Sequence, residues 1–437
     1  MAKRSSAEAE CEGFVRHGRL RRSSSVKNAL RVLVTAAIVV SMSGVATVAY
    51  AAWGLWSNVD TVDLGGGEAV DAGSQSLKGE VNILLVGSDT REGQKYNDGE
   101  EGELNDVNLL LHISEDHKNA TVVSFPRDLM IPFPSCPGPN GEPDYYPAMS
   151  EQQLNSAITY GGLPCAVDTI EELTGMKIPY AGKITFDGVT AMSTAIGGVE
   201  VCLTQPIVDE ATNLDLPAGM NTLVGDEALQ FLRTRHGVGD GGDTSRISNQ
   251  QVFMSAMVRK LKSAETLTDP LKVYRLAKAG VENMQLSSNM ATVQFMQALA
   301  GTVKDIDLEH INFVQYPTSN HPYAEGRLMP NYADAEVLFD ILASGESFTV
   351  QSTGEGVAVE GEDPATDDPA ATEDPGATED PAATEDPAAT EDPAATEEPA
   401  TDDPAATTNP DGTRKLPPSV TGQGAATQTC SAGRTVL

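Results

Sequence analysis

Short apolar runs separated by polar turns recur through the middle of the chain and predict the strands of a sheet. Three of these runs, at 81–87, 107–113 and 119–125, are rich in branched apolar residues, which is typical of buried strands. We expect these three to form the centre of the sheet. Similar runs at 197–203 and 311–317 predict two further strands.

Between these runs, apolar residues recur at the three- and four-residue spacing of helices. Ser150 begins one such stretch, and Gln153 follows it at the spacing of a capping box. Because helices and strands are intermixed over residues 81–350, we expect one layered α/β/α domain with a central mixed sheet. The predicted helices cover 150–159, 166–175, 224–235, 244–262 and two segments between 270 and 302.

An apolar segment, residues 32–56, predicts a transmembrane helix. It contains no charged side chain and is long enough to cross the roughly 30 Å hydrocarbon layer. Residues 1–31 hold eight Lys and Arg against three Glu, so we expect them to stay cytoplasmic and the rest of the chain to be extracellular. A cleaved signal peptide is the alternative, because AYAAWG at 49–54 resembles a cleavage site. Trp53 and Trp56 lie where interfacial anchors occur and favour a single-pass membrane protein.

Two polar segments flank the predicted domain. Residues 57–80 form a linker on its N-terminal side, and residues 351–437 form an acidic tail on its C-terminal side. From Gly354 to Asp411 the chain repeats a sequence close to Glu-Asp-Pro-Ala-Ala-Thr, with 19 acidic residues and no Lys or Arg. Such a composition forms no packed core, so we expect a disordered, extended spacer. The threonines beside proline leave two alternatives, a plain solvated spacer and one that carries O-linked sugar.

The whole chain is strongly acidic, with a formal net charge of −34. Binding to a nucleic acid backbone requires a broad surplus of Lys and Arg on the protein surface. The composition therefore argues against nucleic acid as a partner.

The cysteines are distributed as in an exported protein. Cys11 falls on the predicted cytoplasmic side, while Cys136, Cys165, Cys202 and Cys430 fall outside, an even number where disulfides persist. Four cysteines allow three pairings. We expect one bridge between two of the three cysteines within the domain, because Cys430 follows the acidic repeat.

Two aspartates lie at the ends of strands that we expect to be neighbours. Asp89 follows the run at 81–87, and Asp106 precedes the run at 107–113. Ligands of open α/β sheets bind at strand ends, and Mg²⁺ is commonly held by one or two carboxylates together with water and substrate phosphate. Both residues are therefore candidate Mg²⁺ ligands. The structural alternative makes Asp89 a turn residue and Asp106 a charged strand edge.

Cations gather in the stretch FLRTRHGVGDGGDTSRISNQQ. Arginine donates through a fixed fork that matches phosphate or carboxylate oxygens, so this clustering in an acidic chain indicates a bound anion. Arg246 and Gln250 are four residues apart, which places them on one side of the predicted helix, with Asp243 as its expected N-cap. Arg233 and Arg235 also fit as partners of a helix C-terminus, and a structural role is the alternative for each residue alone.

The order of six segments resembles the LytR-CpsA-Psr family of cell-wall ligases. The resemblance covers residues 81–262 and depends on the succession of motifs, since no single motif is decisive. In chain order the motifs are NILLVGSDTR, VVSFPRDLMIP, LNSAITYGG, IGGVEVCL, LPAGMNTLVGDEALQFLRTRH and DTSRISNQQ.

The resemblance implies an enzyme of cell-wall assembly. Such proteins bind a polyprenyl-pyrophosphate-linked glycopolymer, with the lipid in an apolar pocket, and transfer the glycan phosphate to a peptidoglycan hydroxyl at the outer membrane face. Pyrophosphate hydrolysis is the expected side reaction without acceptor. By the resemblance, Asp89 and Asp106 bind Mg²⁺, Arg127, Arg233, Arg235 and Arg246 are catalytic and bind the pyrophosphate, and Arg91 and Gln250 complete the pyrophosphate-binding set.

The sequence departs from the family pattern at two places. Leu104 and Asn105 stand where members commonly have Arg and Ser, and Asn249 stands where they commonly have Arg. The loss of two cations leaves a second hypothesis, a non-catalytic cell-envelope protein that binds the lipid-linked glycan.

The base and the lipid pocket are less well defined by the sequence. Asp106 and Asp128 are both candidates for the base that accepts the proton of the incoming hydroxyl. We expect the lipid pocket to lie among apolar helices near 185–200 and 289–300.

Overall fold

The computed structural model divides the chain into two compact units, Met1–Gly54 and Leu55–Leu437. In the first unit the structure describes residues 28, 30, 33–35 and 54, so the predicted basic segment and transmembrane helix lie largely outside the described residues. No helix in the described part of the chain is both long and apolar enough to cross a bilayer. In the second unit the described residues are 59–64, 70, 74, 76–90, 103–138, 142–263, 269–359, 408–409 and 412–436.

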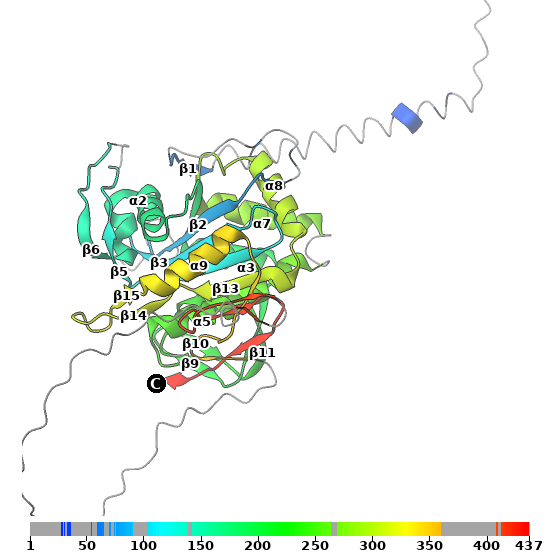
Figure 1. Cartoon of the computed structure of the whole chain (residues 1–437). Coiled ribbons are helices and arrows are strands. Elements are labelled where there is room, and N and C mark those ends of the chain that lie inside the picture. The colour runs from blue at the N-terminus through cyan, green and yellow to red at the C-terminus, as the bar shows by residue number, and fades with distance from the viewer. Residues whose placement is uncertain are drawn as a thin grey trace, which may run out of the picture. The chain divides into compact units, whose positions relative to one another are not determined.

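An eight-stranded mixed sheet forms the centre of the second unit (Figure 1). In spatial order its strands are β1 (Asp60–Val62), β12 (Met284–Ser287), β7 (Tyr180–Ile184), β2 (Val81–Ser88), β3 (Asn105–Ile113), β4 (Ala120–Phe125), β13 (Ile311–Gln315) and β19 (Gly422–Gly424). β3 is antiparallel to both β2 and β4, whereas β7 and β13 are parallel to β2 and β4, respectively. The predicted mixed sheet and its three central strands are therefore confirmed.

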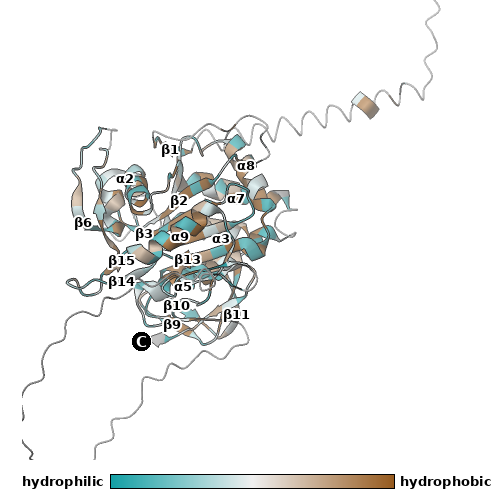
Figure 2. Ribbon diagram, viewed as in Figure 1, coloured by the Kyte–Doolittle hydropathy of each residue, from teal (hydrophilic) through white to brown (hydrophobic). Residues whose placement is uncertain are grey.

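Helices pack on both faces of this sheet, which gives the predicted α/β/α layers. The alternation of side chains along β2 directs Leu84 to one face and Ile83 to the other. Helices α2 (Ala157–Thr174) and α9 (Tyr332–Ser344) cover the face of Leu84, and α8 (Val293–Lys304) covers the face of Ile83. Figure 2 shows hydrophobic and hydrophilic residues together on α9, as expected for a helix with one buried face.

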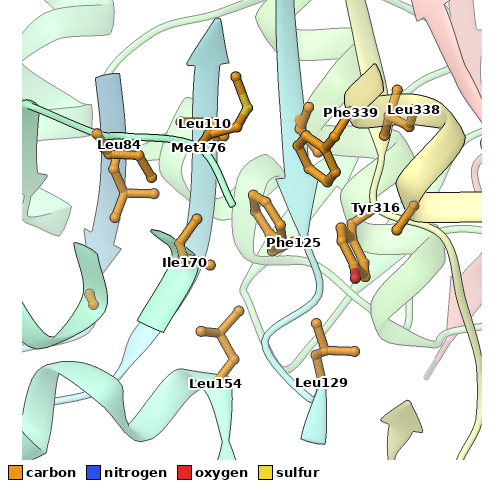
Figure 3. Close-up of a cluster of buried hydrophobic side chains, with 14 of the residues drawn as sticks. Leu84, Leu110, Phe125, Leu129, Leu154, Ile170, Met176, Tyr316, Leu338 and Phe339 are labelled. Atoms are coloured by element: carbon orange, nitrogen blue, oxygen red, sulfur yellow. The ribbon is translucent and has the colours of Figure 1, made fainter. Parts of the chain in front are cut away.

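Aromatic rings fill the centre of the core beneath α9. The rings of Phe125 and Tyr316 are stacked with centroids 5.1 Å apart, and Phe339 of α9 lies 6.2 Å from Tyr316 (Figure 3). All three side chains are buried. This packing fixes the end of β4, and Arg127 follows that end by two residues.

A smaller sheet lies beside the first. Its strands are, in order, β11 (Gly219–Leu223), β8 (Val199–Leu203), β20 (Thr429–Ser431) and β17 (Val357–Val359). Helices α4 (Asp226–Arg233) and α5 (Asp243–Lys262) bury Phe231 and Phe253 against it. Because α5 also contacts β13 and β19, it connects the two sheets.

The other described elements are short or peripheral. They are β5 (Met130–Phe133), β6 (Met149–Gln153), a 3-10 turn (Leu154–Ser156), α3 (Phe186–Ala195), β9 (Ile207–Asp209), β10 (Leu214–Leu216), α7 (Pro270–Asn283), a second 3-10 turn (Leu308–His310), β14 (Thr318–Asn320), β15 (Leu328–Pro330), β16 (Phe348–Thr349), β18 (Arg414–Lys415) and β21 (Thr435–Val436).

The predicted helix at 150–159 is wrong in its first half. Ser150 lies in β6, which pairs with β5, and α2 begins only at Ala157. Backbone pairing with β5 therefore outweighs the capping-box pattern, and Ser150 caps no helix. Several further strands were not predicted. In the main sheet they include β7, β12, which separates α7 from α8, and β1, which lies within the predicted linker and pairs with β12.

The prediction that residues 351–437 form only a disordered tail is wrong at both ends of that segment. β17 lies just beyond the predicted domain boundary, and residues 412–436 pack on the domain. β19 joins the edge of the main sheet beside β13, and β20 pairs with both β8 and β17. Backbone pairing and side-chain burial in the described C-terminal residues thus enlarge the domain beyond the predicted boundary at 350. Most of the acidic repeat, residues 360–407, lies outside the described residues.

Two disulfides join the four cysteines that were predicted to lie outside the membrane. Cys136 pairs with Cys165, which confirms a bridge between two cysteines of the predicted domain. Cys202 of β8 pairs with Cys430 of β20, at a sequence separation of 228 residues. The second bridge attaches the C-terminal segment covalently to the smaller sheet.

Candidate functional site

A cavity of about 410 Å³, here called the arginine cavity, lies among strands β2 and β3 and helices α3, α4 and α5. Most of its lining is apolar, for example Leu85 of β2, Met192 of α3, Leu232 of α4 and Met257 of α5. The lining also includes six of the eight predicted site residues, namely Asp106, Arg127, Arg233, Arg235, Arg246 and Gln250.

Asp243, the first residue of α5, holds three of the arginines together. Its buried carboxylate pairs with Arg246 at 2.5 Å and Arg235 at 3.4 Å, and lies 3.9 Å from Nε of Arg127. It also accepts a hydrogen bond from the backbone N–H of Arg127 at 3.1 Å. The predicted N-cap role is wrong, because Gly242 occupies that position. Asp243 instead offsets the repulsion that would separate the three guanidinium groups.

Asp106 connects this group to the start of β3. Arg127 donates to the Asp106 carboxylate at 2.6 Å, and Arg246 donates to the Asp106 backbone carbonyl at 3.1 Å. Asp128 lies 3.6 Å from Nε of Arg127 and pairs with Arg327 at 2.5 Å. Of the two candidate bases, Asp106 is the one that lines the arginine cavity.

Burial and charge shift the ionisation of these groups in opposing ways. Burial raises the pKa of the Asp243 carboxyl, although Arg246 lowers it. Burial also lowers the pKa of the Arg246 guanidinium, against the opposing effect of Asp243. For Arg127, burial lowers the pKa, but the carboxylates of Asp106, Asp128 and Asp243 together raise it above its ordinary value. Arginine ordinarily ionises far above neutral pH, so we expect both guanidinium groups to stay cationic.

Two donors of this cluster have no hydrogen-bond partner within the described part of the chain. They are the buried Nε atoms of Arg127 and Arg246, and both residues line the cavity. A buried donor without a partner costs about 1–3 kcal/mol. An anion in the cavity would offer acceptors to both residues, and native proteins rarely leave such groups unbonded without a reason.

Arg233 and Arg235 reach the same cavity although they are two residues apart. α4 ends at Arg233, and Thr234 takes an extended conformation with ψ of 136°. The chain therefore leaves the helix between the two arginines, which allows both to line the cavity. The Arg233 guanidinium lies over the Phe186 ring, 4.6 Å from its centroid.

Gln250 lies one turn beyond Arg246 on α5, and both line the cavity as their spacing predicts. The Gln250 amide donates to the backbone carbonyl of Leu232 at 3.0 Å. This bond fixes the amide beside α4.

Of the other two predicted residues, Asp89 is absent from the described lining of the cavity, and Arg91 lies outside the described residues. The Asp89 carboxylate accepts the backbone N–H of Leu104 at 2.7 Å, which fits the structural alternative of a turn residue. No group of three or more His, Cys, Asp or Glu in the described residues is arranged to hold a metal ion. Asp106 is the predicted metal ligand that lines the cavity.

Two of the three residues that depart from the family pattern are buried and form hydrogen bonds within the domain, whereas Leu104 is exposed. The buried Asn249 amide donates to the carbonyl of Phe231 at 2.8 Å and accepts from Ser431 at 2.7 Å. The buried Asn105 amide donates to the carbonyl of Leu154 at 3.0 Å. Asn249 therefore connects α5 to the C-terminal segment and supplies no charge to the cavity.

The predicted apolar pocket is correct for one helix and wrong for the other. α3 lines the cavity with Phe186, Val189 and Met192, as the prediction for 185–200 requires. No residue between 289 and 300, all of which are described, contributes to the lining. α8 packs on the same face of the sheet, in the cluster that includes Leu85, but it does not reach the cavity, and Phe253, Met254 and Met257 of α5 line the cavity in its place.

The sequence is similar to those of known proteins. Residues 57–338 match the model of the LytR_cpsA_psr family. The cell wall biosynthesis protein LcpA of Corynebacterium glutamicum is 30% identical over 268 residues, which are 55% of this chain and 51% of that protein. The chain therefore spans about half the length of this curated relative. A second relative, from Enterococcus faecalis, is 24% identical over 55% of this chain and 76% of its own length. It is named polyisoprenyl-teichoic acid–peptidoglycan teichoic acid transferase TagU.

A solved structure shares the fold. Protein gbs0355 of Streptococcus agalactiae superposes with a TM-score of 0.51 at 22% identity, over 61% of this chain and 88% of that one. At this identity the likeness concerns the arrangement of helices and strands alone.

Proposed function

The chain belongs to the LytR_cpsA_psr family, and from this premise we propose that it is a membrane-anchored transferase of cell-wall assembly. Its donor is a glycopolymer linked by pyrophosphate to a polyprenyl lipid, and its acceptor is a peptidoglycan hydroxyl. The name of the TagU relative states such a transfer for teichoic acid, and the name of LcpA states a role in cell-wall biosynthesis. The proposed topology is single-pass, with a cytoplasmic N-terminus and the folded domain outside.

The proposal depends mainly on one observation, that a single cavity has a cationic part and an apolar part. Arg127, Arg235 and Arg246 provide fixed guanidinium donors, two of them with buried Nε atoms that make no hydrogen bond within the described structure. The remaining lining is mostly apolar side chains. A polyprenyl pyrophosphate has the same two parts, a dianionic or trianionic head and a hydrocarbon chain. Few other ligands would contact both the cationic part and the apolar part of the cavity.

The proposed reaction is a phosphoryl transfer. The acceptor hydroxyl oxygen bonds to the phosphorus next to the glycan, the bond from that phosphorus to the bridging oxygen breaks, and polyprenyl phosphate leaves. The hydroxyl proton passes to Asp106 or to solvent water. Such a reaction needs mainly positioning and neutralisation of the phosphate oxygens. Arg127 and Arg246 would supply the neutralising donors on either side of Asp106.

Mg²⁺ is the proposed cofactor, and the donors at the cavity fit it. Mg²⁺ is usually held by one or two carboxylates, with substrate phosphate and water as its other ligands. Asp106 supplies such a carboxylate at the cavity, and its ion pair with Arg127 fixes its orientation. When bound, the metal would withdraw charge from the phosphate oxygens. Asp89, bonded to Leu104, remains a proposed second ligand.

One observation favours a second candidate function, binding of the lipid-linked glycan without catalysis. Asn249 bonds to Phe231 and Ser431 and adds no cation to the cavity. A cavity with fewer cations could bind a pyrophosphate and still stabilise the transition state poorly.

Phosphate release from a short polyprenyl pyrophosphate, measured with the full chain in detergent, tests the proposal. We expect release with Mg²⁺, none with a chelator, and a loss of about 10²–10³-fold in Arg246→Ala, the cost of removing one fixed donor. Arg275→Ala is the matched control, because Arg275 is an exposed arginine of α7 outside the cavity lining. Binding without release in the presence of a peptidoglycan acceptor would favour the second candidate. Equal release by Arg246→Ala and wild type would refute the assignment of the site.

A further inference from the structure

A second cavity, of about 840 Å³, lies in the same folded unit and shares no lining residue with the arginine cavity. Its walls come from β1 and the residues after it, the loop after Cys136, the beginning of α2, and one residue each of β7 and β12. Among the described residues, no arginine lines it. The two cavities therefore present different chemistry.

The shape of the second cavity is fixed by a break in α2 and by a disulfide. Gly161 and Gly162 have non-helical backbone angles, and Gly162 has a φ of 66° that favours glycine. A Cβ on Gly161 would come within 2.8 Å of the Pro137 carbonyl and of Cβ of Cys165. The Cys136–Cys165 bridge holds the loop of Pro137 against this break. Two walls of the cavity are thus joined covalently.

The wall carries many groups that can exchange hydrogen bonds with hydroxyls. They include hydroxyl, carboxyl, amide and ammonium groups, along with the ring of a tyrosine, and they alternate with small and apolar residues. Thr159, Lys183 and Gln285 already donate to Glu103 or Asp60, and a sugar chain, unlike a hydrocarbon chain, can add further donors and acceptors to such a polar wall. The polar side chains of the lining are Thr61, Asp63, Tyr146, Thr159, Asp168, Lys183 and Gln285.

Glu103 connects the two cavities. Its carboxylate accepts from Lys183, which lines the second cavity, at 2.8 Å, and from Ser88, which lines the arginine cavity, at 2.7 Å. Ser88 pairs with Asn105 in the β2–β3 ladder, and Asn105 precedes Asp106. One carboxylate therefore separates the second cavity from the strand ends at which the phosphate would be held.

We propose that the second cavity is the acceptor subsite, where a hydroxyl-rich glycan strand binds and presents a hydroxyl toward Asp106. This inference rests on the proposed transferase function, which requires an acceptor beside the pyrophosphate. A flat, exposed acceptor site would leave water to compete for the phosphate, whereas a walled cavity holds the sugar in place. The arginine cavity then binds the donor and the second cavity binds the acceptor.

Two variants test the subsite without changing the donor site. Thr61→Trp places a large ring at the cavity from an exposed position on edge strand β1, and Asp168→Ala removes an exposed carboxylate of α2. The matched controls are Thr222→Trp, on exposed edge strand β11, and Asp340→Ala, on the exposed side of α9. Neither control residue lines a cavity described here.

The experiment measures two rates with the full chain. The first is Mg²⁺-dependent phosphate release from a short polyprenyl pyrophosphate without acceptor. The second is transfer from a polyprenyl-pyrophosphate-linked disaccharide to soluble, uncrosslinked glycan strands of N-acetylglucosamine and N-acetylmuramic acid. We expect Thr61→Trp to raise the KM for the glycan strands about tenfold, the effect of losing about 1.4 kcal/mol of binding, and Asp168→Ala to raise it less. Phosphate release should stay within about twofold of wild type, since uniform loss of acceptor binding does not alter donor cleavage.

The outcomes separate this inference from the function on which it rests. If wild type releases no phosphate and transfers nothing, the proposed function fails, and calorimetric binding of the glycan strands to wild type and Thr61→Trp still tests the cavity. If wild type transfers the disaccharide and both cavity variants keep the wild-type KM for the strands, the acceptor subsite is refuted while the function stands. Equal binding by wild type and Thr61→Trp refutes the subsite in either case.

Discussion

The charged part and the apolar part of the arginine cavity share helix α5 but are held in place by different contacts. Arg246 is fixed by an ion pair with Asp243 and by a hydrogen bond to the Asp106 backbone. Met257, about three turns further along the same helix, lines the cavity through packing alone among the described contacts. One part thus depends on specific partners, and the other depends on filling a volume.

This difference predicts unequal tolerance to substitution. A guanidinium in a network loses several contacts when its geometry changes, because each partner is itself buried or paired. An apolar wall keeps its function when one side chain is replaced by another of similar size. We therefore expect the charged part to control catalysis and the apolar part to control lipid affinity.

Arg127→Lys should have the largest effect. Lysine keeps the charge but lacks the planar fork that contacts both Asp106 and Asp243. We expect kcat for phosphate release to fall by about 10²-fold or more, as for other fixed donors, with a smaller change in KM. Steady-state kinetics beside Arg275→Lys measure this. If Arg127→Lys keeps the wild-type kcat, a positive charge alone is sufficient for catalysis at this position. The charged part would then tolerate substitution as the apolar part does.

Val189→Trp should have an intermediate effect of a different kind. Val189 of α3 lines the apolar part, and an indole ring there would occupy space that the lipid chain needs. We expect the affinity for a short polyprenyl pyrophosphate to fall about tenfold, within the cost of overpacking, with kcat at saturation nearly unchanged. The same change at exposed Val273 of α7 is the control. A loss confined to kcat would contradict the assignment of this part to lipid binding.

Ser431→Ala should have the smallest effect, and it should act on both parts equally. Ser431 donates to Asn249 behind α5, so its loss leaves a buried amide oxygen with one partner fewer. We expect the free energy of unfolding to fall by about 1–3 kcal/mol, with kcat and lipid affinity each changing less than about threefold. Denaturant titration beside Ser344→Ala, an exposed serine of α9, checks it. An effect on kcat alone would mean that the C-terminal segment acts on the arginines selectively.

Local patterns in the sequence predicted most of what lies close together along the chain. The apolar runs predicted β2, β3 and β4, and the four-residue spacing placed Arg246 and Gln250 on one side of α5. The arginines were recognised as a group because they follow one another within one short stretch. These features depend on neighbours in sequence, which periodicity can detect.

Contacts between distant segments could not be predicted in this way. Asp243 has the residue type of an N-cap but is the first residue of α5, and its role with Arg127 depends on how α5 approaches the end of β4. The β20 strand follows a long acidic repeat and pairs with β8 more than 200 residues earlier, through Cys430 and Cys202. The apolar lining was predicted on α8 because α8 has the more apolar sequence, whereas tertiary packing places Phe253, Met254 and Met257 of the more polar α5 at the cavity.

The central claim is that one cavity binds both parts of the donor, the pyrophosphate through Arg246 and the lipid chain beside Val189. A double-mutant cycle in the binding of a short polyprenyl pyrophosphate tests this claim most directly. Calorimetric Kd values would be measured for wild type, Arg246→Ala, Val189→Trp and the double variant. We predict that each single variant binds more weakly and that the two losses in binding free energy add to within about 0.5 kcal/mol, as for independent sites. Unchanged affinity in both single variants would contradict the claim that this cavity holds the lipid pyrophosphate.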